Sequence, residues 1–189
     1  MPFPISTNTL ILDASCVISL YASRQMFHIL DAIPRTVTVA AYVAKKEVLN
    51  VYGDADENGQ PVRQPVDLRP FIDAGLLQLV SIDSEEEAET FATFASMIRD
   101  QGEAITGAIA YHRNWAVVMD DRKARRLLSE HAGHLPLLYT LDLVKYWADV
   151  QSPAPSLLST ALQNIRHYAR YTPPKRHLLF DWWHENDGG

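Results

Sequence analysis

The chain has 189 residues, of which 47% are hydrophobic, 21% charged and 10% aromatic. This length and composition fit one compact domain with an appendage, and they exclude wholesale disorder and a small fold that depends on disulfides. The formal net charge of −6 argues against a broad electrostatic attraction to nucleic acid or to an anionic membrane, so a polyanion would have to meet a local basic patch.

The sequence has a single cysteine, Cys16, so no disulfide can form within the chain and a reducing compartment is favoured. No run of apolar residues approaches the length of a membrane span. We therefore expect a soluble, cytoplasmic protein that makes no contact with membranes.

Apolar runs alternate with segments of helical periodicity through most of the chain. In the first part we expect a strand over 9–13, two short helices over 17–21 and 26–30, a strand over 36–39, a helix over 41–51 and a loop over 53–66. Further on we expect a strand over 76–82, helices that start near 84 and near 102, a strand over 115–119, a basic helix over 122–131, an edge strand over 135–138, and helices over 140–150 and 157–168. The pattern does not resolve residues 172–189.

This alternation predicts an α/β fold with a mostly parallel central sheet. We expect the α/β domain to occupy residues 1–150 and a helical extension that packs on it to occupy 151–189.

Four acidic residues are placed where they could converge. Asp13 and Asp120 each end an apolar strand, and ligands of open parallel sheets bind beyond the carboxyl ends of the strands. Glu103 opens the helix before the second of these strands, and Glu47 is expected on the helix after 36–39. Clustered carboxylates repel one another unless a cation neutralises them, and Mg²⁺ or Mn²⁺ suits an all-oxygen site. Helix capping or solvent exposure would also explain each acid taken alone.

Two segments resemble a known family. Residues 10–18, Leu-Ile-Leu-Asp-Ala-Ser-Cys-Val-Ile, resemble the opening of a PIN domain. The Gly-Glu-Ala of 102–104 and the Asp-Asp-Arg-Lys-Ala-Arg-Arg of 120–126 resemble blocks of its VapC-like branch. The resemblance covers about residues 9–150.

The resemblance implies a three-layer α/β/α fold and a metal-dependent ribonuclease, often the toxin of a toxin–antitoxin pair. The family acids correspond to Asp13, Glu47, Glu103 and Asp120. Asp13 and Asp120 would bind Mg²⁺ or Mn²⁺ directly, and Glu47 and Glu103 would bind a second ion or orient its water. Asp121 would join the metal site or only cap the helix that follows it.

A basic cluster follows Asp120 directly and consists of Arg122, Lys123, Arg125 and Arg126. We expect these side chains to contact RNA phosphates, although an exposed helical face would explain them too. RNA is the expected substrate. An antitoxin protein and a second copy of the chain in a homodimer are the expected partners.

Two alternatives stay open. Ala14, Ser15 and Met119 depart from residues common in the family, which would suit a catalytically silent module that binds nucleic acid or protein. A phosphotransferase or phosphatase with Asp13 as nucleophile is the weaker alternative, because that chemistry usually places a second aspartate where Ser15 stands.

Overall fold

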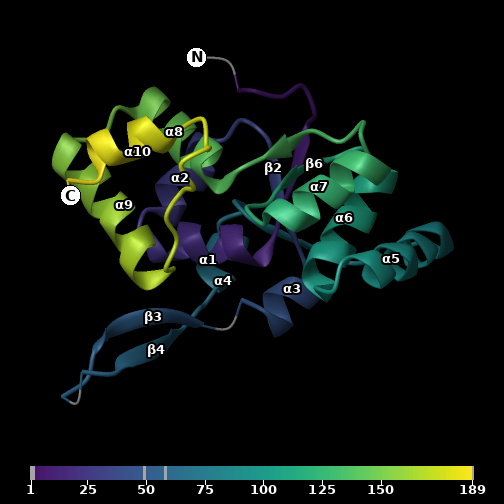
Figure 1. Ribbon diagram of the computed structural model, residues 1–189, viewed down its shortest axis with the longest axis horizontal. Helices are drawn as coiled ribbons and strands as arrows, with labels where there is room; N and C mark the ends of the chain where they lie inside the picture. The colour runs from purple at the N-terminus through teal and green to yellow at the C-terminus, as the bar shows by residue number, and fades with distance from the viewer. Residues whose placement is uncertain (1–2, 49, 58, 189) are drawn as a thin grey trace.

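The computed structural model describes residues 3–48, 50–57 and 59–188 (Figure 1). Its centre is a sheet of five parallel strands in the order β5-β2-β1-β6-β7. The strands are β1 (Thr9–Leu12), β2 (Thr36–Ala40), β5 (Gln78–Val80), β6 (Ala116–Val118) and β7 (Leu137–Leu138). The predicted α/β class with a parallel sheet is confirmed.

Strand β1 lies in the middle of the sheet, between β2 and β6. Leu10 is paired with Val37 on one side and with Ala116 on the other. The apolar residues of β1 are fully buried because helices cover both faces of the sheet, which explains why the strand is apolar throughout. The chain therefore leaves β1 and β6 side by side, at the same edge of the sheet.

Helices cover the sheet on two sides, as the three-layer expectation required. One layer holds α1 (Ala14–Ala22), α2 (Met26–Ala32) and α8 (Thr140–Gln151), which contact one another. The other holds α5 (Glu85–Met97), α6 (Gln101–Arg113) and α7 (Arg122–His131), of which α6 contacts β1, β2 and β6. Gly107 lets α6 approach α7 closely, because a Cβ there would lie only 2.7 Å from a methyl carbon of Leu128.

The last part of the chain forms α9 (Pro155–Tyr168) and α10 (Phe180–Asn186). Helix α9 packs against α1, and α10 packs against α9 through the fully buried Trp183. The second helix lies in the segment that the sequence pattern left unresolved. None of the helices in the described residues is both long and apolar enough to cross a membrane.

The prediction of a loop over 53–66 is wrong. Strands β3 (Asn50–Ala55) and β4 (Pro61–Pro65) form an antiparallel hairpin there, which projects from the body of the molecule (Figure 1). Its turn is closed by the amide of Gln60, which donates to Asp56 Oδ1 at 2.9 Å, and by Gly59 in the left-handed region at φ 75°. Backbone pairing, which leaves no apolar signature on an exposed strand, holds this segment together.

The helix predicted over 41–51 is shorter than expected. Helix α3 spans Ala41–Lys46 and is followed by Glu47, which caps its C-terminal end. A short helix α4 (Arg69–Asp73) follows the hairpin. Positions 49 and 58, which the predicted helix and loop included, lie outside the described residues, as do 1–2 and 189.

Candidate active site

Asp13 and Asp120 lie at the carboxyl ends of two neighbouring strands, as predicted. Asp13 follows β1 directly, and its amide donates to the carbonyl of Val118 in β6 at 3.0 Å. Asp120 comes two residues after that carbonyl. The parallel pairing of β1 with β6 therefore carries both carboxylates to one edge of the sheet.

Asp13 is the most buried of these acids, with 3% of its surface exposed. It caps the start of α1, and its Oδ2 accepts hydrogen bonds from the hydroxyl of Ser15 at 2.8 Å and from the Ser15 amide at 3.4 Å. Its other oxygen, Oδ1, is buried and has no hydrogen-bond partner in the described part of the chain. Burial raises the pKa of Asp13 to about 6. An orphaned buried carboxylate oxygen is a natural ligand for a cation.

Asp120 is held by Thr140 at the start of α8. The Thr140 amide donates to Oδ1 at 3.0 Å, and the Thr140 hydroxyl donates to Oδ2. Burial raises the pKa of Asp120 in spite of these two bonds. Thr140 is a positioning residue that the sequence did not indicate, because it lies 20 positions away and meets Asp120 only in the folded chain.

Glu47 and Glu103 meet at the N-terminal end of α6. The carboxylate of Glu47 accepts a hydrogen bond from the Gly102 amide, and a Cβ on Gly102 would collide with that carboxylate. Glu103 stands in the first turn of the same helix, which Asp100 caps by accepting from the Glu103 amide at 3.0 Å. Burial, followed by repulsion from neighbouring acids, raises the pKa of Glu47 to about 7 and that of Glu103 to about 8.

These acids line one pocket with a volume of about 520 Å³. Its acidic lining consists of Asp13, Glu47, Asp100, Glu103, Asp120 and Asp121. Asp100 is a further acid of the pocket that was not predicted from the sequence, although its position three residues before Glu103 is that of a helix N-cap. The described lining contains no lysine, arginine or histidine, so nothing in it offsets the negative charge.

The donor set fits a hard divalent ion, although the side chains do not form a closed cage. Among the described residues, no group of three acidic, histidine or cysteine side chains is near enough to hold one ion as it stands. Mg²⁺ usually keeps several waters and is held by one or two carboxylates. Direct ligation by Asp13 and Asp120, with Glu47 and Glu103 acting through water, would meet that requirement.

Asp121 caps α7, which is one of the two roles considered for it. Its Oδ1 accepts from the amides of Lys123 and Ala124, each at 2.8 Å. The residue is exposed and still borders the acidic pocket. Its carboxylate is thus already engaged by the helix that it begins.

The basic cluster divides into two parts. Arg122, Lys123 and Arg126 line a separate exposed hollow of about 530 Å³ on α7. Arg125 does not join them, in contrast to the expectation. Its guanidinium donates to the carbonyls of Met119, Leu137 and Leu138 and lies 3.5 Å from the centre of the Tyr139 ring. Arg125 therefore ties the ends of β6 and β7 together and is not placed to contact phosphate.

The C-terminal extension contributes to the pocket, which the sequence did not predict. Tyr171, Thr172 and Pro174 line it together with the acids. The Tyr171 hydroxyl is buried without a hydrogen-bond partner in the described part of the chain, and burial together with the Asp120 charge raises its pKa. An unpaired hydroxyl in an acidic pocket is a donor available to a bound ligand.

The chain matches no family model and no curated protein.

Proposed function

We propose that this protein is a PIN-type ribonuclease that hydrolyses RNA phosphodiesters with Mg²⁺ or Mn²⁺. The main support is the gathering of Asp13, Glu47, Glu103 and Asp120 around one pocket at the carboxyl edge of β1 and β6. Burial raises the pKa of each of them and charges of neighbouring acids raise it further, and the described lining of the pocket contains no cationic side chain. A divalent cation is the partner that this charge arrangement calls for.

The residues have distinct roles in the proposed mechanism. Asp13 offers its free Oδ1 as a ligand, and Asp120 is held in place as a second ligand by Thr140. Asp13 and Asp120 would hold the ion, which when bound would activate water for in-line attack and stabilise the leaving oxygen. The charges of Asp13 and Asp100 raise the pKa of both Glu47 and Glu103, so these two glutamates could take up or release the proton of an attacking water.

Phosphate attraction has to come from outside the acidic pocket. Arg122, Lys123 and Arg126 lie on the helix that begins at Asp121, so they are placed to contact the RNA backbone next to the scissile phosphate. We include in the proposal a reducing, cytoplasmic location, which suits the buried free Cys16. A role as an antitoxin-controlled toxin, and assembly as a homodimer, belong to the same proposal.

The test is cleavage of a mixed RNA pool by the purified chain, with Mg²⁺ or Mn²⁺ and with EDTA. We expect cleavage that EDTA abolishes. Asp13→Asn should remove cleavage while RNA affinity persists, because the loss of a negative charge does not weaken phosphate attraction. Asp31→Asn is the matched control, since Asp31 is exposed in a hollow beside Arg35, at the opposite end of the sheet. Cleavage without metal, or cleavage retained by Asp13→Asn, would refute the mechanism.

A silent binding module is the second candidate. The observation that favours it is that the acids do not form a ready-made cage in the described residues, while the Ser15 hydroxyl already occupies one oxygen of Asp13. Under this alternative the wild type binds RNA but cuts no RNA at any metal concentration. The same assay therefore separates the two candidates.

A further inference from the structure

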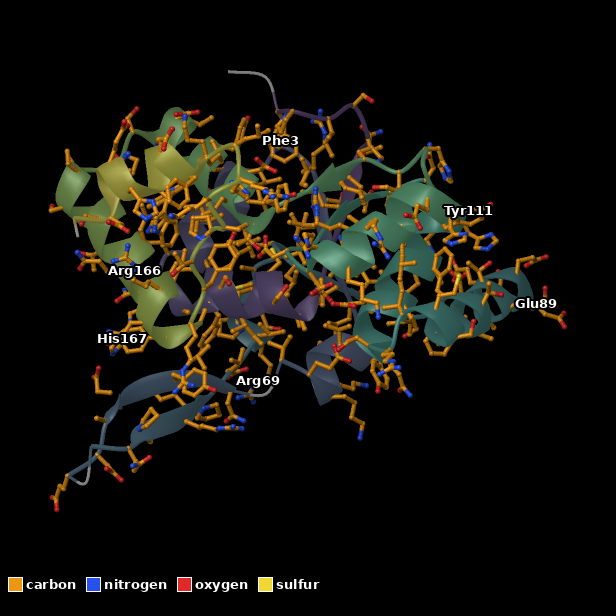
Figure 2. The ribbon with its side chains drawn as sticks, in the orientation of Figure 1. Phe3, Arg69, Glu89, Tyr111, Arg166 and His167 are labelled. Carbon is orange, nitrogen blue, oxygen red and sulfur yellow. The ribbon has the colours of Figure 1, made fainter. Side chains whose placement is uncertain are left out.

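The β3–β4 hairpin carries a surface that the proposed chemistry does not use. The hairpin contacts α1 and α9 and, together with them, encloses a hollow of about 210 Å³. The lining consists of Ile18, Asn50, Val51, Tyr52, Arg63 and Tyr168. In Figure 2 the hairpin side chains lie next to the end of α9 at which His167 is labelled.

Two tyrosines and three arginines lie in and around this hollow, and we call them together the tyrosine–arginine surface: Tyr52, Tyr168, Arg24, Arg63 and Arg170. Tyr52 is directly opposite Arg63 in the antiparallel register, so their side chains share one face of the hairpin. The Arg170 guanidinium lies 3.6 Å from the centre of the Tyr52 ring, and that of Arg24 lies 4.9 Å from the centre of the Tyr168 ring. Two of the three guanidinium groups therefore pack against a tyrosine ring.

The charge of this surface is opposite to that of the pocket beside it. Three arginines are gathered here in a chain whose net charge is −6. One aspartate, Asp54, lies beside them and accepts a hydrogen bond from the Tyr168 hydroxyl at 2.8 Å. Arg24, Arg63 and Arg170 are all exposed. Exposed arginines among tyrosine rings are the usual means by which proteins hold a single strand, since rings stack on bases and guanidinium groups neutralise phosphates.

The backbone holds two of these arginines in an unfavourable conformation. Arg24 and Arg170 have φ values of 59° and 54°, in the left-handed region that side-chain-bearing residues seldom adopt. Each follows the end of a helix, a position where glycine is the common choice. Asn114 and Ser152 adopt the same region at the ends of α6 and α8, so this conformation terminates helices and fixes where the two arginines leave them.

The tyrosine–arginine surface is continuous with the acidic pocket. Ile18 lines both hollows, so they share a wall on α1. The chain also runs from one hollow to the other at the end of α9, because Tyr168, the last residue of that helix, borders the first while Tyr171 and Thr172 border the second. A single nucleic-acid strand that lies on the tyrosine–arginine surface can therefore extend into the acidic pocket.

We propose that the tyrosine–arginine surface binds single-stranded RNA and guides it into the acidic pocket. This inference deepens the proposed function by naming the surface that binds the substrate, and it rests on that function for the choice of RNA. Stacking requires base faces that a duplex keeps covered, which is why the substrate is single-stranded. Tyr52 and Tyr168 would stack on bases, and Arg63 and Arg170 would hold the phosphates between them.

The test measures binding separately from cleavage. The full chain in EDTA is titrated against a fluorescent single-stranded RNA of about ten nucleotides, and anisotropy gives Kd. We expect Tyr52→Leu to weaken binding roughly tenfold and Tyr52→Phe to keep it, because stacking needs the ring and not the hydroxyl. Tyr111→Leu is the matched control, since Tyr111 is also partly exposed and lies on the opposite side of the molecule (Figure 2).

A second pair of variants tests the charge. Arg63→Gln should weaken binding and reduce its salt dependence, whereas Arg35→Gln, at the residue before β2, should change neither. Equal binding by wild type and Tyr52→Leu, or tighter binding of a duplex, would overturn the inference. Tighter binding of the matching DNA strand would overturn the choice of RNA. Binding that behaves as expected without any metal-dependent cleavage would refute the proposed function and leave the surface standing.

Discussion

Replacing Asp13 by asparagine should stabilise the metal-free protein at neutral and alkaline pH. Only 3% of the surface of Asp13 is exposed, and this burial raises its pKa from 3.8 to about 6. Such a rise corresponds to about 3 kcal/mol, at about 1.4 kcal/mol for each pKa unit. The asparagine amide would place a buried N–H where Oδ1 has no partner, which offsets about 1–2 kcal/mol of that gain. We expect a net gain of about 1–2 kcal/mol.

The sign of the pH dependence follows from the raised pKa. A carboxyl group whose folded pKa is above its unfolded value destabilises the fold above the folded pKa. That destabilisation fades as the pH falls from about 6 to about 4, because the folded protein then takes up the proton. The advantage of Asp13→Asn should therefore be full near pH 8 and absent near pH 4.

Thermal unfolding in EDTA, followed by circular dichroism, measures this difference. For a chain of this length a gain of 1–2 kcal/mol corresponds to a rise in Tm of roughly 2–8 °C. Asp31→Asn again serves as the control for the loss of one charge at an exposed position. A Tm of Asp13→Asn below that of the wild type, or the same difference in Tm near pH 8 and near pH 4, would show that Asp13 has a structural role. Added Mn²⁺ should raise the Tm of the wild type more than that of Asp13→Asn.

Three further outcomes follow from the same pocket. Gly102→Ala should lower both the Tm and the rise in Tm caused by Mn²⁺, because its Cβ would displace the Glu47 carboxylate; an unchanged response to metal would contradict this. The affinity for Mn²⁺, measured by titration calorimetry, should increase from about pH 6 to about pH 8, since the pKa values of Glu47 and Glu103 are about 7 and 8 and metal must displace their protons; a flat profile would contradict it. Tyr171→Phe should keep or slightly raise the Tm while lowering the rate of RNA cleavage, and unchanged cleavage would show that the hydroxyl does not donate to the bound RNA.

The strands and the acids at their ends were predictable because their signals are local. An apolar run that stops at Asp13, and another that stops just before Asp120, reflect strands buried on both faces whose ends reach the edge of the sheet. Helix α7 was predicted with its observed bounds because it begins after a capping aspartate and has a continuous helical pattern. Such patterns depend only on the residues that form the element.

The hairpin and the full composition of the pocket were not predictable from such patterns. Strand β4 is exposed along its length, so no apolar alternation marks it. Thr140 and Tyr171 reach the acids through tertiary contacts between segments that are distant in sequence. The PIN resemblance ends near residue 150 and gives no indication of Tyr171.

The structural role of Arg125, in contrast, could have been predicted from the sequence. Arg125 lies three positions before Leu128, and residues three apart lie on the same side of a helix. Leu128 is buried, so Arg125 is directed towards the ends of the strands, where the carbonyls accept its hydrogen bonds. The basic run therefore consists of an inward structural arginine and three exposed cations.

The separation of charge around the pocket connects metal binding with RNA binding. The acids repel a phosphate that approaches without a cation, while the arginines of the tyrosine–arginine surface and of α7 attract it. RNA and metal should therefore bind cooperatively, since each relieves a repulsion that opposes the other. Asp13→Asn relieves part of the same repulsion permanently, so its RNA affinity in EDTA should exceed that of the wild type even though it cannot cut. Under the proposed function, this arrangement of charges requires that the inert variant hold RNA more tightly than the wild type.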